Sequence, residues 1–249
     1  MNGLIQSTVA SRGLAVVQPE SIQDASFPVP FDTDGKLAKF YQDLSKEIET
    51  DTPIYRATVG LGGSRDFNVR TGMEEMDTSS PRICGIILYA HDFNVYFDED
   101  LPGEPPVCTA IDGITGANRL TGETCSCADC PKNRRVDGRK ECRNKVRLYV
   151  LTEGTPVPLA IDVPPASLIV WKNFRRSLRH FGYLEPQDAL TEFVLEAAQN
   201  ANKIKYSKIK MKVIGKLDKD TAEKVEWIRQ NFVPDMTVEL TDFAEVQDA

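Results

Sequence analysis

Apolar residues recur every three to four positions in three stretches of the chain, a period that predicts amphipathic helices. The first stretch covers residues 34–50, with Asp34 as a suitable N-cap. The second begins near Pro165, a residue favoured in the first turn of a helix, and the third covers residues 218–232. The side chains expected to face the core are Leu37, Phe40, Tyr41, Leu44 and Ile48, then Leu168, Trp171, Phe174, Leu178 and Phe181, and finally Ala222, Val225 and Ile228.

Shorter apolar runs between these helices predict β-strands. Because the strands do not alternate strictly with helices, they favour an α+β protein, a small sheet or barrel with helical additions. We expect one α+β domain over residues 36–232, preceded by a loosely packed arm at 1–35 and followed by a tail at 233–249. The predicted strands are residues 54–59, 67–70, 82–90 turning into 93–97, 146–152, 190–197 and 204–214.

One of these strands alternates apolar and basic residues without interruption. Ile209, Met211 and Val213 alternate with three lysines, Lys208, Lys210 and Lys212, so all three lysines should share one face of the sheet. Like charges about 6.8 Å apart on one face repel each other, which favours an anionic ligand lying along them. A stretched, unstacked single strand matches this spacing better than a duplex does. A lysine-rich edge strand that prevents aggregation would show the same pattern, and this alternative stays open.

Composition and the distribution of apolar residues indicate the cellular compartment. With 41% hydrophobic and 27% charged residues, the chain resembles an ordinary soluble domain. No run of 18 apolar residues predicts a transmembrane helix, and the N-terminal residues lack the features of a secretory signal. We therefore expect a cytoplasmic protein with no membrane contacts, in a compartment where thiols stay reduced unless they are catalytic or bind metal.

The net charge of −7 conceals a strong segregation of charge. Residues 106–219 carry 20 basic and 12 acidic side chains, whereas residues 1–105 carry 8 and 17, and residues 220–249 carry 2 and 8. This asymmetry indicates a middle segment that binds a polyanion, flanked by acidic segments. A solvated surface of mixed sign would give the same counts, so charge alone leaves both interpretations open.

Five of the six cysteines lie between residues 108 and 142. Cys127 and Cys130 form a Cys-x2-Cys knuckle, the spacing that holds two thiolates against one tetrahedral zinc ion. Cys108 and Cys142 are within reach of the same centre, while Cys125 could replace Cys127 or remain a spare thiol. Cys84, in an apolar strand, is expected to be a small core residue.

A structural zinc site is the interpretation we favour, since residues 108–142 contain too few large apolar groups to form a core of their own. A thioredoxin-like redox pair is an alternative, but that motif opens a helix after a strand, whereas here Pro131 and a basic loop follow the knuckle. Thiols with no shared role are the third possibility.

Basic side chains cluster around the cysteines and continue onto the second predicted helix. Residues 132–147 carry eight basic and two acidic side chains, more than a zinc–thiolate cluster needs for charge balance. Aromatic side chains next to these cations could stack on unpaired bases. The predicted nucleic-acid contacts are Lys132, Arg134, Arg135, Arg139, Lys140, Arg143, Lys145, Arg175, Arg176, Lys208, Lys210, Lys212, Tyr149 and Tyr206.

The ordered segments "GIILYAHDFNVYF", "PPVCTAIDGITGA", "GETCSCADCP" and "ECRNKVRLYVLTEGTPVPLAIDVPPASLIVWKNFRRSL" resemble a family of phage- and prophage-encoded proteins described as single-stranded DNA-binding. The resemblance covers about residues 83–215. It implies an OB-like barrel with an inserted four-cysteine zinc element at about residues 106–145, and Cys108, Cys127, Cys130 and Cys142 as the Zn²⁺ ligands, with Cys125 as an extra thiol.

We therefore expect a non-enzymatic, zinc-stabilised protein that binds single-stranded DNA in phage replication or recombination, in the host cytoplasm. Acidic C-terminal tails in many single-strand binders compete for the basic groove and recruit replication or recombination proteins, and residues 233–249 are similar in charge. The alternative is a protein-interaction module that docks on host machinery without binding nucleic acid. An enzyme is not expected, because the chain has only two histidines and its clustered thiols are accounted for by the metal site.

Overall fold

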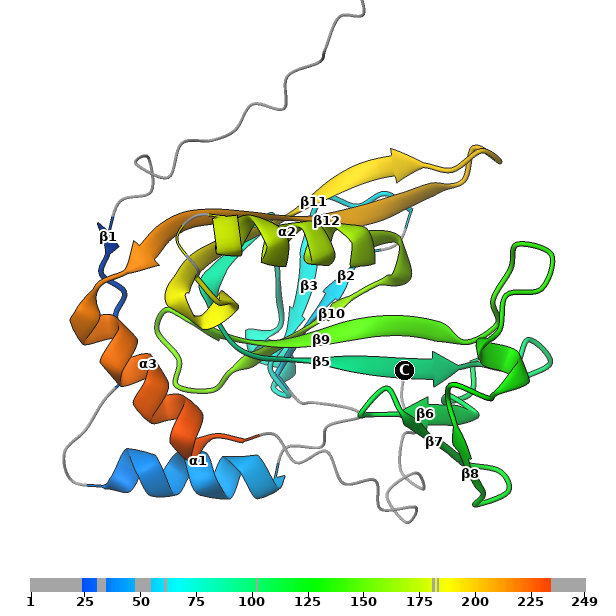
Figure 1. Ribbon diagram of the computed structural model, residues 1–249, viewed down its shortest axis with the longest axis horizontal. Coiled ribbons are helices and arrows are strands. Elements are labelled where there is room, and N and C mark those ends of the chain that lie inside the picture. Colours follow the sequence, from blue (N-terminus) through cyan, green and yellow to red (C-terminus); the bar gives the residue numbers. More distant parts are fainter. Residues whose placement is uncertain are drawn as a thin grey trace, which may run out of the picture.

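One sheet curls into a half-barrel around a helix, giving an α+β fold (Figure 1). The computed structural model describes residues 24–30, 35–47, 55–60, 62–101, 103–180, 182 and 184–233. In these residues the strands are β1 (Asp24–Ala25), β2 (Arg56–Val59), β3 (Phe67–Arg70), β4 (Thr78–Ser80), β5 (Arg82–Tyr96), β6 (Cys108–Ala110), β7 (Thr115–Asn118), β8 (Thr124–Ser126), β9 (Arg143–Thr152), β10 (Leu159–Val163), β11 (Ala189–Gln199) and β12 (Lys205–Leu217). The helices are α1 (Lys36–Glu47), α2 (Leu168–His180) and α3 (Lys219–Asn231), with 3-10 turns η2 (Glu74–Met76), η3 (Pro131–Asn133), η4 (Pro165–Ser167) and η5 (Pro186–Asp188).

The sheet is mixed, and β5 is its longest strand and branch point. The main path runs β1-β12-β11-β5-β9-β10-β2-β3-β4, with parallel pairing at β1–β12 and β10–β2 and antiparallel pairing elsewhere. β11 pairs with the first part of β5, and β6 pairs with its last residues on a branch that continues through β7 to β8. The cysteine-rich segment is therefore an extension of the sheet at the far end of β5.

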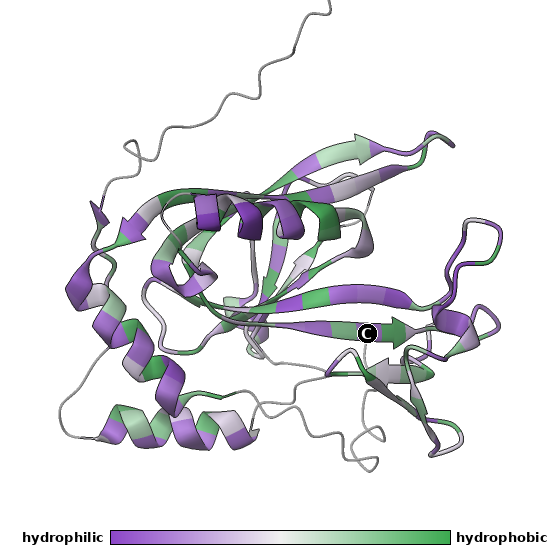
Figure 2. Cartoon of the chain, in the orientation of Figure 1, coloured by the Kyte–Doolittle hydropathy of each residue, from purple (hydrophilic) through white to green (hydrophobic). Residues whose placement is uncertain are grey.

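The two faces of the sheet carry separate apolar clusters. On β9, Leu148 and Val150 pack on one face with Trp171 and Phe174 of α2, and we call this the inner face. Tyr149, between them in the sequence, packs on the opposite, outer face, which α1 and α3 cover. Strand alternation thus separates a cluster under α2 from a cluster under α1 and α3. The turns of α2 that face the viewer in Figure 2 are mainly hydrophilic.

A buried hydrogen bond fixes where α2 begins. Ser167 in η4 is fully buried, and its Oγ accepts a hydrogen bond of 2.9 Å from the backbone N–H of Ile209 on β12. Because buried backbone donors are almost always paired, this contact sets the start of α2 against the strand that crosses it. Among the described residues, no helix has the length and apolar character needed to cross a membrane.

The sequence predicted the helices and the longer strands correctly, to within a few residues. Two predicted strands, 82–90 and 93–97, form one continuous strand, β5. β4, β10 and the three short strands β6, β7 and β8 were not predicted from the sequence. Only residues 24–30 and Gly35 of the predicted arm and Val233 of the predicted tail are among the described residues, so the expectations for both lie largely outside them.

Candidate nucleic-acid interface and metal centre

Five cysteines that are spread over 35 positions of the chain line a single cavity of about 180 Å³. Cys108 lies on β6 and Cys125 on β8, while Cys127 follows β8 directly. Cys130 precedes η3, and Cys142 immediately precedes β9. All five are free thiols, as is Cys84, which is half-buried on β5 and does not line the cavity. The four predicted zinc ligands are thus brought together, and Cys125 joins them.

Hydrogen bonds hold the loops that carry these thiols. The Cys127 N–H donates to the Ile114 carbonyl at 2.8 Å, and the Cys142 N–H donates to the Lys132 carbonyl at 2.9 Å. The Asn133 side chain donates to the Cys127 carbonyl at 2.6 Å. These bonds connect the β7–β8 hairpin, η3 and the start of β9 in a segment that has few apolar side chains.

Gly116 on β7, the strand between β6 and β8, leaves space for two of the sulfur atoms. A Cβ atom at Gly116 on β7 would lie 2.8 Å from Cys108 Sγ and 3.5 Å from Cys125 Sγ. β6 and β8 flank β7, so the two cysteines are two strand spacings apart, about 9–10 Å between backbones. That separation exceeds the Cα distance that a disulfide spans, whereas two ligands of one metal ion can bridge it.

Without a bound cation, the surroundings of these thiols favour the neutral thiol over the charged thiolate. Burial, together with the charge of the neighbouring thiols, raises the pKa of Cys108 to about 12 and that of Cys142 to about 11. Burial likewise raises the pKa of Cys127, although a hydrogen bond from Asn94 opposes the shift. In the described part of the chain no three Cys, His, Asp or Glu side chains form a ready-made coordination shell. The donor chemistry nevertheless fits zinc, which binds thiolates and would stabilise their charged form.

A groove of about 520 Å³ separates this cysteine-rich element from α2. Lys172 and Arg175 of α2 line one side, and Ser126, Asn133 and Asn144 line the other. A second groove of about 330 Å³ continues it along β5, since both share Asp92, Val146, Trp171 and Arg175 as lining residues. Three cations and one carboxylate line the larger groove, namely Lys145, Lys172, Arg175 and Asp92.

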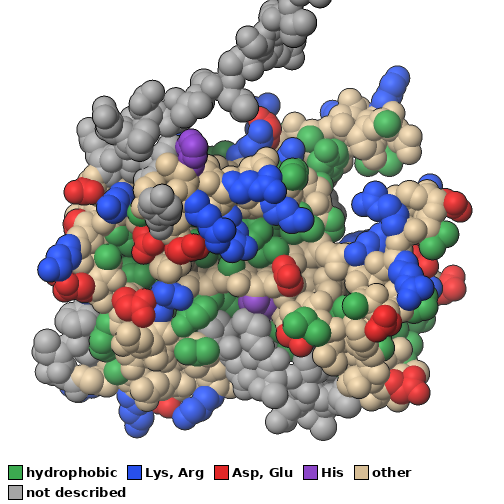
Figure 3. Space-filling model, viewed as in Figure 1, with side chains coloured by type: hydrophobic (Ala, Val, Ile, Leu, Met, Phe, Trp, Pro, Cys, Tyr) green, Lys and Arg blue, Asp and Glu red, His purple; other side chains and the backbone are tan. Residues whose placement is uncertain are grey.

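Exposed cations lie both on α2 and on the cysteine-rich element. Figure 3 shows basic side chains gathered over α2 and, separately, on the lobe formed by the cysteine-rich element. The predicted contacts Arg175 and Arg176 are exposed on α2, as is Lys172, which was not among the predicted contacts. In the cysteine-rich element, four predicted contacts are exposed in the loop between η3 and β9: Arg134, Arg135, Arg139 and Lys140.

Three further predicted contacts are engaged within the protein. Lys132 forms a 2.5 Å ion pair with Glu141 and lies 5.0 Å from the centre of the Tyr96 ring. Lys145 lies 3.7 Å from Asp162, and burial lowers its pKa although this carboxylate opposes the shift. The exposed Arg143 guanidinium lies over Phe97 at 5.2 Å. These three side chains contribute positive charge, but their contacts within the protein make them less available to a phosphate than the exposed cations of α2.

The face that carries the β12 lysines contains their counter-charges. As predicted, Lys208, Lys210 and Lys212 lie on one face, opposite the buried Ile209. Glu196 of β11 pairs in register with Lys208 and lies 3.1 Å from the Lys210 ammonium, and Glu192 pairs with Lys212. Cross-strand glutamates therefore reduce the repulsion that favoured an anionic ligand along these lysines, and their contact with nucleic acid stays a prediction.

The two tyrosines differ in accessibility. Tyr149 is fully buried, with its ring 5.8 Å from Phe232 and stacked on His91, so the expectation that it stacks on a base was wrong. The outer face of β9 is covered, which strand patterning could not reveal. Tyr206 is half-buried on the lysine face, opposite Ala198, and its stacking role stays a prediction.

Sequence reasoning missed three asparagines at the groove. Asn144 donates its side-chain N–H to Asn94 Oδ1 and, at 3.2 Å, to Asn133 Oδ1, which links β9, β5 and η3. Asn94 is buried and donates to the Gly113 carbonyl at 2.9 Å. No periodicity marks these residues, because their partners are distant in the chain.

Comparison of the chain with protein-family models, with curated proteins and with solved structures finds no match.

Proposed function

We propose that this protein binds single-stranded DNA in the groove between α2 and the cysteine-rich element. The observation that carries the proposal is that Lys145 of β9 and Lys172 and Arg175 of α2 line one groove, whose lining contains only one carboxylate, Asp92, among the described residues. Phosphates would pair with Lys172 and Arg175 on one side and with the exposed arginines of the η3–β9 loop on the other.

The groove also offers apolar surface to unpaired bases. Leu168, Trp171 and Ile114 line it, and Ile114 is 68% exposed. Apolar and basic side chains side by side are typical of proteins that bind single strands, because unpaired bases need contacts that a duplex does not require. The curled sheet is compatible with the OB-like barrel that the resemblance implies, and such barrels bind single strands across their faces and loops.

Zinc is the proposed cofactor of the cysteine-rich element. Bound by four of the five thiols around Gly116, the ion would stabilise the fold of the element by cross-linking its loops, and it would take no part in catalysis. The metal would then fix the shape of the basic loop, and no catalytic role is assigned to the residues of the element. Action in phage replication or recombination, and partner recruitment through the acidic C-terminal segment, belong to the same proposal.

Fluorescence anisotropy with a labelled oligonucleotide tests the proposal. Affinity should fall steeply between 50 and 300 mM salt, with a log–log slope of about −0.7 for each phosphate contacted. The double variant Lys172→Gln/Arg175→Gln should bind roughly tenfold more weakly and should flatten the slope by about 1.4, the share of two contacts. The matched control is Lys39→Gln, which removes an exposed charge on α1.

Duplex DNA of the same length provides the comparison for strand specificity. Weaker binding to the duplex supports the groove as a single-strand site. Equal affinity at both salt concentrations, or no binding of any oligonucleotide, would contradict the proposal. If the wild-type protein binds no oligonucleotide, that result would favour the alternative, a module that docks on a protein partner.

A further inference from the structure

The outer face of the sheet carries a row of cations that meets the groove only at Lys145. It crosses β9, β10, β2 and β3, where the register places Arg147 beside Asp162 and Arg56 beside Arg70. Arg56 also pairs in register with Ala160, which packs in the outer cluster. These polar side chains therefore lie on the outer face, whereas α2 and the groove lie on the inner face.

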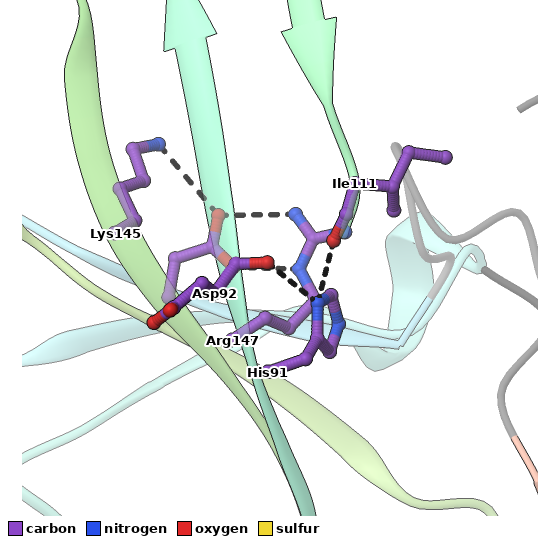
Figure 4. A network of polar contacts seen from close by, with 6 residues as sticks. His91, Asp92, Ile111, Lys145 and Arg147 are labelled. Carbon is purple, nitrogen blue, oxygen red and sulfur yellow. Dashed lines mark hydrogen bonds and ion pairs between the residues drawn. The ribbon is translucent and has the colours of Figure 1, made fainter. Parts of the chain in front are cut away.

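The single carboxylate in this row is already engaged. Asp162 accepts hydrogen bonds from Arg147 Nε at 2.7 Å and from Nη2 at 3.1 Å, and Lys145 Nζ lies 3.7 Å away. Figure 4 shows Lys145 and Arg147 with these contacts dashed, next to His91, whose Nδ1 lies 2.7 Å from the Ile111 carbonyl oxygen. Two cations thus share one acidic group, which leaves no charge to balance a third.

Arg56 and Arg70 lie directly opposite each other on antiparallel strands. Like charges in this arrangement destabilise a sheet. Arg56 is half-buried, and burial lowers its pKa, as do the charges of Arg70 and Arg147, with Asp162 opposing them. No described carboxylate lies within ion-pair distance of either guanidinium. Two neighbouring arginines therefore remain without a counter-charge among the described residues.

We propose that Arg56 and Arg70 form a binding site for a phosphoryl oxyanion. Each guanidinium presents a planar fork of donors that matches a phosphate edge, so two adjacent forks can grip one group from two sides. The next pair along the same face, Thr58 and Asn68, is polar and uncharged, so it does not repel an anion. The bound group replaces the missing counter-charge and removes the repulsion between the two arginines.

The phosphoryl group comes either from a free phosphate compound or from the backbone of a nucleic acid. The site is on the opposite face from the groove, so it does not depend on the proposed function. Failure of one leaves the other intact: the groove is tested by variants of α2, and this site by variants of β2 and β3.

Thermal unfolding with inorganic phosphate or pyrophosphate tests the first source. At ten times the dissociation constant, the melting temperature of the wild type should rise by about 3–5 °C, with chloride at equal ionic strength as the reference. Arg56→Gln and Arg70→Gln should each abolish the rise. Arg65→Gln, a change of an exposed arginine on the β2–β3 connection, should retain it.

Oligonucleotide affinity tests the second source. A roughly tenfold loss in Arg56→Gln but not in Arg65→Gln assigns the site to backbone phosphates, and a phosphate-dependent melting shift without that loss assigns it to free phosphate. The proposal is overturned if neither ligand distinguishes Arg56→Gln from Arg65→Gln. It is also overturned if Arg56→Gln lowers the melting temperature without any anion, because the counter-charge then comes from within the chain.

Discussion

Replacing Gly116 with alanine should disrupt the thiol cavity without changing any cysteine. The added Cβ would lie 2.8 Å from Cys108 Sγ, and ordinary contact begins at 3.4 Å, so the sulfur or the strand must move by about 0.6 Å to restore an ordinary contact. Metal–ligand distances tolerate only about ±0.2 Å. The variant should therefore bind zinc at least about tenfold more weakly, and overpacking should lower the free energy of unfolding by about 1–3 kcal/mol.

Zinc content by atomic emission and affinity by chelator competition measure the first effect, and urea unfolding measures the second. Gly122→Ala is the matched control, because Gly122 has a φ of +70° but nothing within 4 Å of the position that an added methyl group would take. It should lose about 1 kcal/mol to backbone strain while retaining the metal. Unchanged zinc affinity in Gly116→Ala, or no zinc in the wild type, would refute the reasoning that these sulfurs share one ion.

Three further outcomes follow from buried polar groups. Burial lowers the pKa of His91, so the unfolded chain binds the proton more readily, and stability should fall as pH drops below about 6.5; His91→Gln should remove this slope in melting curves, whereas His180→Gln should not. Asp162→Asn leaves Arg147, whose side chain is 4% exposed, without its carboxylate and should cost about 3 kcal/mol in urea unfolding; a loss below about 1 kcal/mol would contradict this. Ser167→Ala leaves a buried N–H of β12 unpaired and should cost about 1–3 kcal/mol, so a neutral effect in the same assay counts against the contact.

Local patterns predicted the helices because each helix buries one stripe of its own residues. Leu168, Trp171, Phe174 and Leu178 recur at helical spacing, and three of the four are buried. The same logic placed the β12 lysines on one face, since strand alternation is a property of consecutive residues. It could not predict Glu192 and Glu196 opposite them, because a cross-strand pair depends on register with a segment elsewhere in the chain.

The cysteine spacing alone made a shared thiol site expected, since a Cys-x2-Cys turn brings two sulfurs together wherever it folds. The convergence of all five clustered thiols depends on β6, β7 and β8, three short strands with almost no sequence pattern. The burial of Tyr149 and the meeting of Arg56 with Arg70 also depend on long-range packing. Periodicity reports which face of an element a residue occupies, but only the completed sheet determines what covers that face and which charges meet on it.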